Sequence, residues 1–280
     1  MNSTFTSFGA FPSVQSVTHQ VSSRHLGREV TLTVLLPPGY DASARKYPLL
    51  LVHDGQDFPA LGLAETLQVL YQEQAVEPLI VVGTHANHDR IYEYGTAHQP
   101  DYAQRGNRAA AHTQFVLEEL LPFLETHFCV STQREQRAVA GCSLGGLMAL
   151  DLAWNNPQYF SRVAVFSGAL WWRSRALDNG YDDQDRIMHR QIREASTRPE
   201  LKCWFQVGTL DETDDRDGDG VIDSIADTLD CIAELERQGY RWGRDVKYLE
   251  VPGGEHNPAT WGRVLPDFLR WAFPGQGPGA

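Results

Sequence analysis

The stretch "AVAGCSLGGLMAL" (138–150) decides the fold, because strand-like sequence turns helical there around one serine. Gly141, Gly145 and Gly146 surround this serine, Ser143. A serine raised from a sheet edge needs a very tight strand-to-helix turn, in which side chains two positions before and after it would collide. Glycine removes those side chains at 141 and 145, and Gly146 lets the helix pack closely on the strand. We therefore predict a nucleophile elbow at Ser143; the alternative is a plain glycine-rich turn.

The rest of the chain alternates short apolar runs with helical periodicity. "YPLLLVHDG" (47–55) and "PLIVVGTHA" (78–86) are continuously apolar, as is typical of strands covered on both faces. Residues 16–36 alternate apolar and polar side chains and predict a hairpin. We further predict strands in "QRAVAG", "SRVAVFSG", "LKCWFQVG" and "DVKYLEVPGG", and helices over 59–75 and 111–127, the second kinked at Pro122. This pattern predicts an α/β fold with a doubly wound, mostly parallel sheet and an antiparallel N-terminal hairpin at its edge.

Length and composition favour one domain over residues 1–280, since 280 residues, 42% of them hydrophobic, suffice for a single large core. An irregular excursion, 168–200, is expected near the edge of the sheet that binds ligands. No apolar run is long enough to span a bilayer, and the N-terminus lacks a secretory signal pattern. We therefore expect a cytoplasmic protein without a membrane partner. The sequence does not indicate the oligomeric state.

Charge is concentrated in one segment. Of the net charge of −12, residues 211–230 carry −8, from eight Asp and one Glu against a single Arg. An acidic balance of this kind argues against a nucleic-acid partner.

A serine nucleophile needs a base and an acid that orients it, and in elbow proteins they follow in the order serine, acid, histidine. His256 comes directly after the last predicted strand, where the chain returns to the sheet edge at which Ser143 is expected. His189 lies inside the excursion. We assign His256 as the base. Asp211, the first carboxylate after "LKCWFQVG", is our choice for the acid. Its rivals are Glu212, Asp214 and Asp215.

The tetrahedral intermediate of acyl transfer also needs two backbone donors. One is the N–H of Leu144, at the start of the elbow helix, where free amides and the helix dipole favour an anion. The other is expected in the loop "HDGQDF" (53–58), where Gly55 permits a turn that leaves the amide of Gln56 available.

The segments "PPGYDASARKYPLLLVHDGQDF" (37–58), "GCSLGG" (141–146), "FSGALWW" (166–172) and "GGEHNPATW" (253–261) resemble the putative-esterase family of α/β hydrolases. That family includes enterochelin, feruloyl and acetylxylan esterases, S-formylglutathione hydrolase and mycolyltransferases. The resemblance implies an α/β-hydrolase fold and a serine esterase, possessing a catalytic triad, that acts on a small-molecule ester of siderophore or aryl type. It matches Ser143, His256 and Asp211 to the family's triad and Gln56 to its second backbone donor.

Five side chains are candidates for substrate binding: Arg90, Tyr94, Trp171, Trp172 and Trp261. The alternative for the tryptophans is an ordinary core position. Two other functions remain open. One is acyl transfer on the same fold, and the other is a non-catalytic protein that binds calcium.

The calcium alternative rests on "DRDGDGVID" (215–223), which has the spacing of a calcium loop. Its ligands would be Asp215, Asp217, Asp219, the carbonyl of Val221, and Asp223. Ala226 stands where a bidentate carboxylate belongs, and a solvated acidic loop is the simpler interpretation. No cofactor is required by the proposed chemistry.

Overall fold

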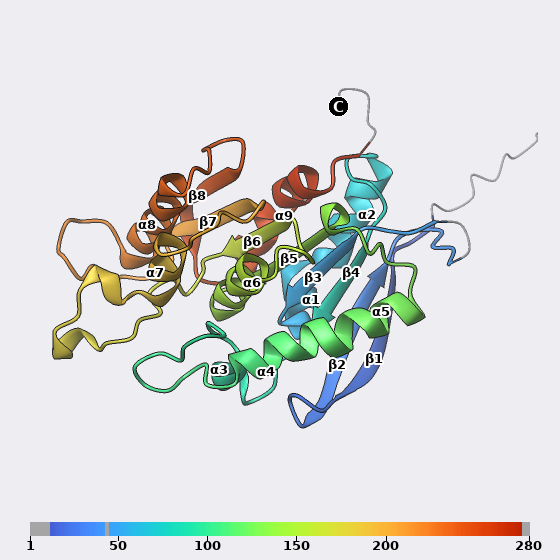
Figure 1. Ribbon diagram of the computed structural model, residues 1–280. Helices are drawn as coiled ribbons and strands as arrows, with labels where there is room; N and C mark the ends of the chain where they lie inside the picture. The colour runs from blue at the N-terminus through green and yellow to red at the C-terminus, as the bar shows by residue number, and fades with distance from the viewer. Residues whose placement is uncertain (1–11, 43–44, 276–280) are drawn as a thin grey trace, which may run out of the picture.

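The computed structural model describes residues 12–42 and 45–275, and its centre is an eight-stranded sheet (Figure 1). Across the sheet, the described strands follow the order β1-β2-β4-β3-β5-β6-β7-β8. They are β1 (Gln15–Ser23), β2 (Arg28–Leu36), β3 (Leu49–His53), β4 (Ile80–Thr84), β5 (Arg137–Cys142), β6 (Arg162–Phe166), β7 (Lys202–Leu210) and β8 (Val246–Glu255). β1 pairs antiparallel with β2, and β2 with β4, while the remaining neighbours are parallel. The fold-class prediction is confirmed.

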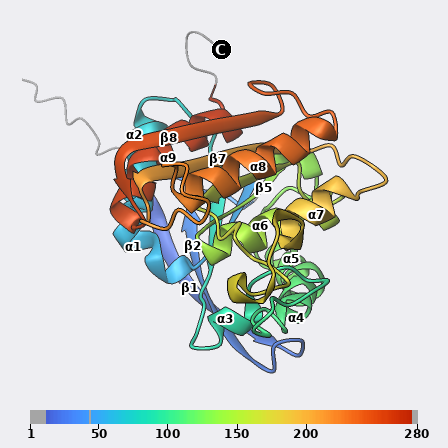
Figure 2. The ribbon, with the colours of Figure 1, turned by 90° about the vertical axis from the view of Figure 1, so that its left-hand side faces the viewer.

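Helices cover both faces of this sheet. The helices are α1 (Phe58–Leu61), α2 (Leu63–Gln72), α3 (Arg90–Glu93), α4 (Ala109–Gln114), α5 (Leu121–His127), α6 (Leu144–Asn155), α7 (Ile187–Arg193), α8 (Asp223–Arg237) and α9 (Pro258–Ala272). Figure 2 shows α1, α2 and α9 on one side and α4 to α8 on the other. Along β3, Leu49 and Leu51 join the core on one face, and Leu50 and Val52 the core on the other. This double burial explains the continuously apolar strand sequences.

Two predicted helices differ in detail from the observed ones. The helix expected over 59–75 is divided by Gly62, whose φ of 61° ends α1 before α2 begins. In the second helix, a π-helical segment (Phe115–Leu120) lies directly before α5, with Pro122 in the first turn of α5. Proline has no N–H to donate to the carbonyl four residues before it, and its ring crowds that carbonyl. The irregularity, a π-helical segment, therefore lies in the turns before Pro122 rather than at it.

The chain segments that follow the parallel strands all leave at one edge. They include the elbow after β5, the excursion 168–200 after β6, the acidic segment after β7 and the loop after β8. The excursion holds two short 3-10 turns, Leu177–Asn179 and Asp183–Asp185, and α7. The described residues share one sheet. A single domain over 1–280 stays a prediction, and residues 1–11, 43–44 and 276–280 of it lie outside the described part. Among the described helices, none combines the length and apolar character needed to cross a membrane.

Candidate active site

Ser143 lies in the tight turn between β5 and α6, with φ 56° and ψ −123°. Such a conformation is strained for any residue other than glycine, and strain of this kind is characteristic of functional turns. A Cβ on Gly141 would lie 2.2 Å from the carbonyl oxygen of Gly145, and a Cβ on Gly146 would lie 3.0 Å from that of Gly141. Gly141 and Gly146 therefore have the steric function expected from the sequence, whereas a Cβ on Gly145 would meet Asp54 Oδ2 at 2.8 Å rather than atoms of the turn.

Asp211 and His256 contact each other at the same edge of the sheet. Asp211 follows β7 directly, and His256 lies between β8 and α9. Asp211 Oδ2 is 3.3 Å from His256 Nδ1, and the carboxylate is fully buried while 41% of the imidazole side chain is exposed. Asp215, one of the rival acids, instead accepts N–H groups from its own loop. The contact through Nδ1 leaves His256 Nε2 free to act as a base.

A chain of short contacts connects this pair to the elbow. The N–H of Ser143 donates to the carbonyl of Phe166 over 2.8 Å, and the next residue, Ser167, donates its hydroxyl to Asp211 Oδ1 over 2.9 Å. Within the described residues, Ser143 Oγ and His256 are not joined by a hydrogen bond. Catalytic hydrogen bonds of free enzymes are often long and tighten when substrate binds.

Ser167 and Trp261 support the acid and the base, a role that sequence reasoning missed for both. Trp261 is buried, its Nε1–H donates to Ser167 Oγ over 2.9 Å, and its ring lies nearly perpendicular to that of His256 with centroids 5.1 Å apart. The one available signal was the position of Ser167, a small polar residue directly after a buried strand. Trp261 is also a substrate-binding candidate from the sequence; its ring contacts that of His256, and substrate binding by it stays a prediction.

The two expected backbone donors lie at the starts of helical turns. Leu144 is the first residue of α6, so its N–H has no partner within the helix. Gln56 lies in the 3-10 turn Gly55–Asp57, which directly follows β3. A Cβ on Gly55 would lie 2.5 Å from the backbone of Gly83 in β4, so only glycine allows this turn to pack on the sheet.

The other substrate-binding candidates divide into buried and accessible residues. Tyr94 and Trp172 are buried, with 1% and 0% of their surface exposed, as core side chains are. Trp171 is partly exposed. It lies close to the elbow, because the N–H of Ala169, two residues before it, donates to the carbonyl of Ser143 over 3.0 Å. Arg90 is partly exposed, and its guanidinium binds Asp54.

Cys142 and the buried histidines contribute no charge near the elbow at neutral pH. Burial raises the pKa of the Cys142 thiol well above its usual value, so it stays protonated beside Ser143. Burial likewise lowers the pKa of His53 to about 4 and that of His112 well below its usual value. Cys142 is therefore a poor competitor for the role of nucleophile.

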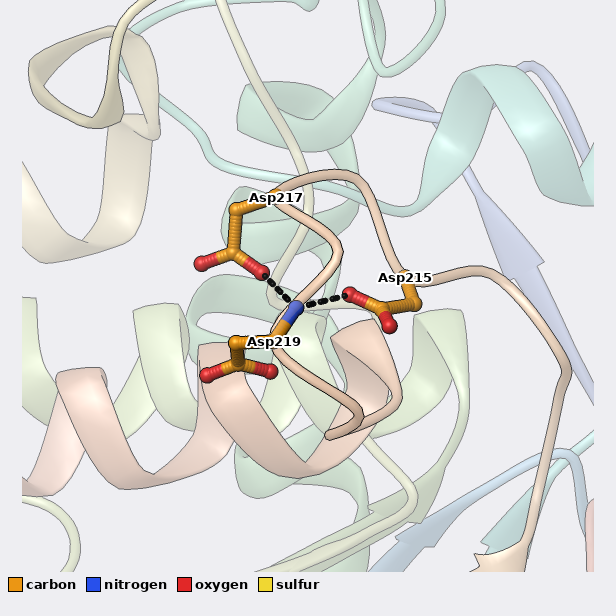
Figure 3. Close-up of side chains that lie close together, drawn as sticks. All are labelled: Asp215, Asp217 and Asp219. Carbon is orange, nitrogen blue, oxygen red and sulfur yellow. Dashed lines mark hydrogen bonds between the residues drawn. The ribbon is translucent and has the colours of Figure 1, made fainter.

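The acidic loop gathers Asp215, Asp217 and Asp219, whose carboxylate oxygens lie within 4.8 Å of one another (Figure 3). Oxygen ligands at this spacing suit calcium. The fifth expected ligand is otherwise engaged, because the Asp223 carboxylate accepts the N–H of Arg216 and pairs with its guanidinium 3.3 Å away. The donor set therefore fits a calcium loop only in part, and calcium binding, including the carbonyl of Val221 as a ligand, stays a prediction.

Comparison with known proteins identifies the family. A family model described as Putative esterase matches residues 23–272. The chain belongs to the esterase family. This membership supports carboxylic-ester hydrolysis as the chemistry.

Individual relatives of this esterase family member are distant. The uncharacterized protein YjcH of Bacillus subtilis (strain 168) is 24% identical over 249 residues, which cover 89% of this chain and 93% of YjcH. A ferulic acid esterase structure superposes with a TM-score of 0.73 at 18% identity, covering 94% of this chain and 98% of that one. The enterobactin esterase of Shigella flexneri has a TM-score of 0.71 at 18% identity, covering 94% of this chain and 61% of that one. The chain likewise spans only 62% of the Bacillus subtilis protein YbbA.

Proposed function

We propose that this chain is a serine carboxylic-ester hydrolase that works through an acyl-enzyme. The observation that carries the proposal is the strained serine of the elbow at the sheet edge where the buried Asp211 carboxylate meets His256. Family membership favours the same chemistry. The described residues offer a nucleophile, a base, an acid that orients the base, and two backbone donors, which together are what acyl transfer needs.

In the proposed reaction, Ser143 Oγ attacks the acyl carbon and its proton passes to His256 Nε2. The amides of Leu144 and Gln56 bind the negative oxygen of the tetrahedral intermediate. The bond from the acyl carbon to the alcohol oxygen then breaks, and His256 returns the proton to that oxygen. Water attacks the acyl-enzyme with His256 again as base, which releases the carboxylic acid and restores Ser143. Asp211 holds the imidazole in one orientation and stabilises its charged form.

The experiment that tests the nucleophile is p-nitrophenyl acetate hydrolysis by Ser143→Ala. We expect turnover to be abolished while the thermal midpoint stays within a few degrees of the parent's, because the removed hydroxyl makes no hydrogen bond in the described structure. A fluorophosphonate probe should label the parent and not the variant. Thr213→Ala, which removes an exposed hydroxyl from the loop after β7, is the matched control and should stay active. Retained turnover in Ser143→Ala would refute the proposal.

For the substrate, we propose an ester that carries an aromatic, electron-rich or anionic group. Arg173 lies 5.5 Å from the ring of Tyr102, 5.8 Å from that of Trp171 and 5.7 Å from that of Tyr181. Within the described residues this guanidinium forms no ion pair, and Tyr102 is 41% exposed. Arg173 Nη1 donates to the carbonyl of Trp171 over 3.4 Å. A guanidinium that lies between aromatic faces and pairs with no carboxylate of the described residues suits a ligand that combines a ring with negative charge. The two solved neighbours named above are a ferulic acid esterase and an enterobactin esterase.

Trp171→Ala tests this substrate class. The ratio of kcat/KM for methyl ferulate to that for p-nitrophenyl acetate should fall about fivefold, which corresponds to about 1 kcal/mol of aromatic contact. Leu177→Ala, in an exposed turn of the same excursion, is the control and should leave the ratio unchanged. A ratio that does not change in Trp171→Ala would contradict the assignment.

A further inference from the structure

The oxyanion turn, defined as residues 54–57, starts from a strained residue. Asp54 has φ 64° and ψ 49°, a left-handed conformation that is unfavourable for a residue with a side chain. It directly precedes Gly55 and Gln56, whose amide is the proposed second donor. Because such a conformation persists only where the surroundings impose it, the contacts of Asp54 determine where that amide lies.

Arg90 makes the strongest of these contacts. Its Nε donates to Asp54 Oδ1 and its Nη2 to Asp54 Oδ2, each over 2.8 Å, so the guanidinium and the carboxylate form two parallel hydrogen bonds. The Asp54 side chain is 6% exposed and that of Arg90 34%. A two-bond contact of this kind fixes the orientation of both groups as well as their distance.

The Asp54 carboxylate also lies against the other donor segment. A Cβ built on Gly145, the residue after Leu144, would lie 2.8 Å from Asp54 Oδ2. One carboxylate thus touches the first turn of α6 and belongs to the oxyanion turn. The spacing between the amides of Gln56 and Leu144 therefore depends on where Arg90 holds this group.

The side chain of Gln56 adds a second tie to the same segment of chain. Its Nε2 donates to Asp54 Oδ1 over 3.2 Å, and its Oε1 accepts the N–H of Ala86, which follows β4, over 3.0 Å. Arg90 follows β4 as well. The contact of Gln56 with Ala86 and that of Asp54 with Arg90 thus hold the oxyanion turn against the segment after β4.

Charge gives Arg90 a second effect on the same site. A buried carboxylate without a partner would repel the negative oxygen that develops near Leu144. The guanidinium of Arg90 neutralises Asp54 and removes this penalty. Two of the three guanidinium nitrogens of Arg90, Nε and Nη2, are engaged by Asp54, and the guanidinium carbon lies 5.2 Å from the centre of the Tyr94 ring, which leaves Nη1 for a substrate.

We propose that Arg90 is a positioning residue for the oxyanion hole, acting through Asp54 on the amides of Gln56 and Leu144, rather than a residue that binds substrate. This inference rests on the proposed function, since it presumes an oxyanion formed by attack of Ser143. It replaces the expectation from sequence that Arg90 recognises the substrate.

The test compares kcat and KM of Arg90→Gln for p-nitrophenyl acetate, which is neutral, and for an ester with a carboxylate in its acyl group. We expect kcat to fall about 10²-fold for both esters, as when one oxyanion donor is lost, with KM for the neutral ester within twofold of the parent's. Arg263→Gln, which alters an exposed arginine of α9, is the control and should leave kcat unchanged. A raised KM for the anionic ester alone, with the neutral ester unaffected, would overturn the proposal.

The double variant Asp54→Asn/Arg90→Gln separates the effect of the unpaired Asp54 carboxylate from a general loss of structure. Because it removes the unpaired carboxylate, its kcat should exceed that of Arg90→Gln at least fivefold. No recovery, together with an unchanged kcat in Asp54→Asn alone, would refute the inference.

If Arg90→Gln does not fold, Arg90→Lys replaces it, because lysine keeps the charge but loses the two-bond contact. Its kcat should fall for both esters, by less than in Arg90→Gln, and an unchanged kcat would again refute the inference. Ser143→Ala is run in parallel: residual turnover there overturns the proposed function, whereas an inactive Ser143→Ala with an unaffected Arg90→Gln overturns this inference only.

Discussion

Replacing Asp211 with asparagine tests whether the acid contributes to catalysis or whether a serine–histidine pair suffices. Asp211 Oδ2 lies 3.3 Å from His256 Nδ1, and the reaction places a positive charge on that imidazole. Two unit charges at this separation attract by about 5 kcal/mol at an effective dielectric constant of 20. Since 41% of the His256 side chain is exposed, solvent screens part of this, and we take about 3–4 kcal/mol as the contribution. That corresponds to a fall in kcat of about 10²- to 10³-fold.

The assay for Asp211→Asn is p-nitrophenyl acetate hydrolysis at pH 7.5, with thermal unfolding measured on the same sample. The variant should fold, because the amide oxygen of asparagine can still accept the hydrogen bond from Ser167. Asp214→Asn, an exposed carboxylate three residues along the same loop, should keep the kcat of the parent. A loss of less than tenfold in Asp211→Asn, with normal folding, would show that the buried carboxylate does not act on His256 as described.

Three further perturbations follow from the same structure. Gly141→Ala should lower the free energy of unfolding by about 3–5 kcal/mol, and kcat with it, because its Cβ would meet main-chain atoms of Gly145 at 2.2 Å. Gly243→Ala, with open space around it but a positive φ, should cost about 1–2 kcal/mol by denaturant unfolding. Equal losses in the two variants would contradict the steric argument. Burial lowers the pKa of His53 and of His189 to about 4, so the unfolded state binds more protons than the folded state as pH falls below 6.5. The free energy of unfolding should therefore drop between pH 7.5 and 5 by about 2 kcal/mol for each histidine. A free energy of unfolding that does not change over this range would refute this. Chelation with EDTA should leave the hydrolysis rate unchanged, because none of the proposed catalytic groups binds a metal; a rate loss that calcium restores would show that the acidic loop does bind calcium and affects the site.

The sequence predicted the fold, and it predicted which segments come together at one edge of the sheet, where local sterics or strand order determine the answer. Gly141 is dictated by a turn only a few residues long, and the apolar runs of the parallel strands follow from burial on both faces. The position of His256 follows from chain order, since a loop that comes after the last parallel strand returns to the same edge.

Other features depend on contacts between residues far apart in sequence, which local pattern does not reveal. Ser167 meets Asp211 and Trp261 across 44 and 94 positions of the chain. Substrate binding by Arg90 stays a prediction, and its contact with Asp54, 36 positions away in the chain, could not be read from the sequence around it. Aromatic residues were the hardest to place, since Tyr94 packs against the rings of His53 and His112, and Trp172 lies close to Gly106, all distant in sequence.

The steric demands on the strand ends have a consequence for how this protein can diversify. Gly141 of the elbow and Gly55 of the oxyanion turn leave no room for an added methyl group, so neither position tolerates a larger residue. The excursion 168–200 leaves the same edge as a long segment with few regular elements, and in it the guanidinium of Arg173 lies against the rings of Trp171 and Tyr181. Under the proposed function, preference for one ester over another would evolve, or be engineered, by exchanging that segment while the reaction chemistry is kept.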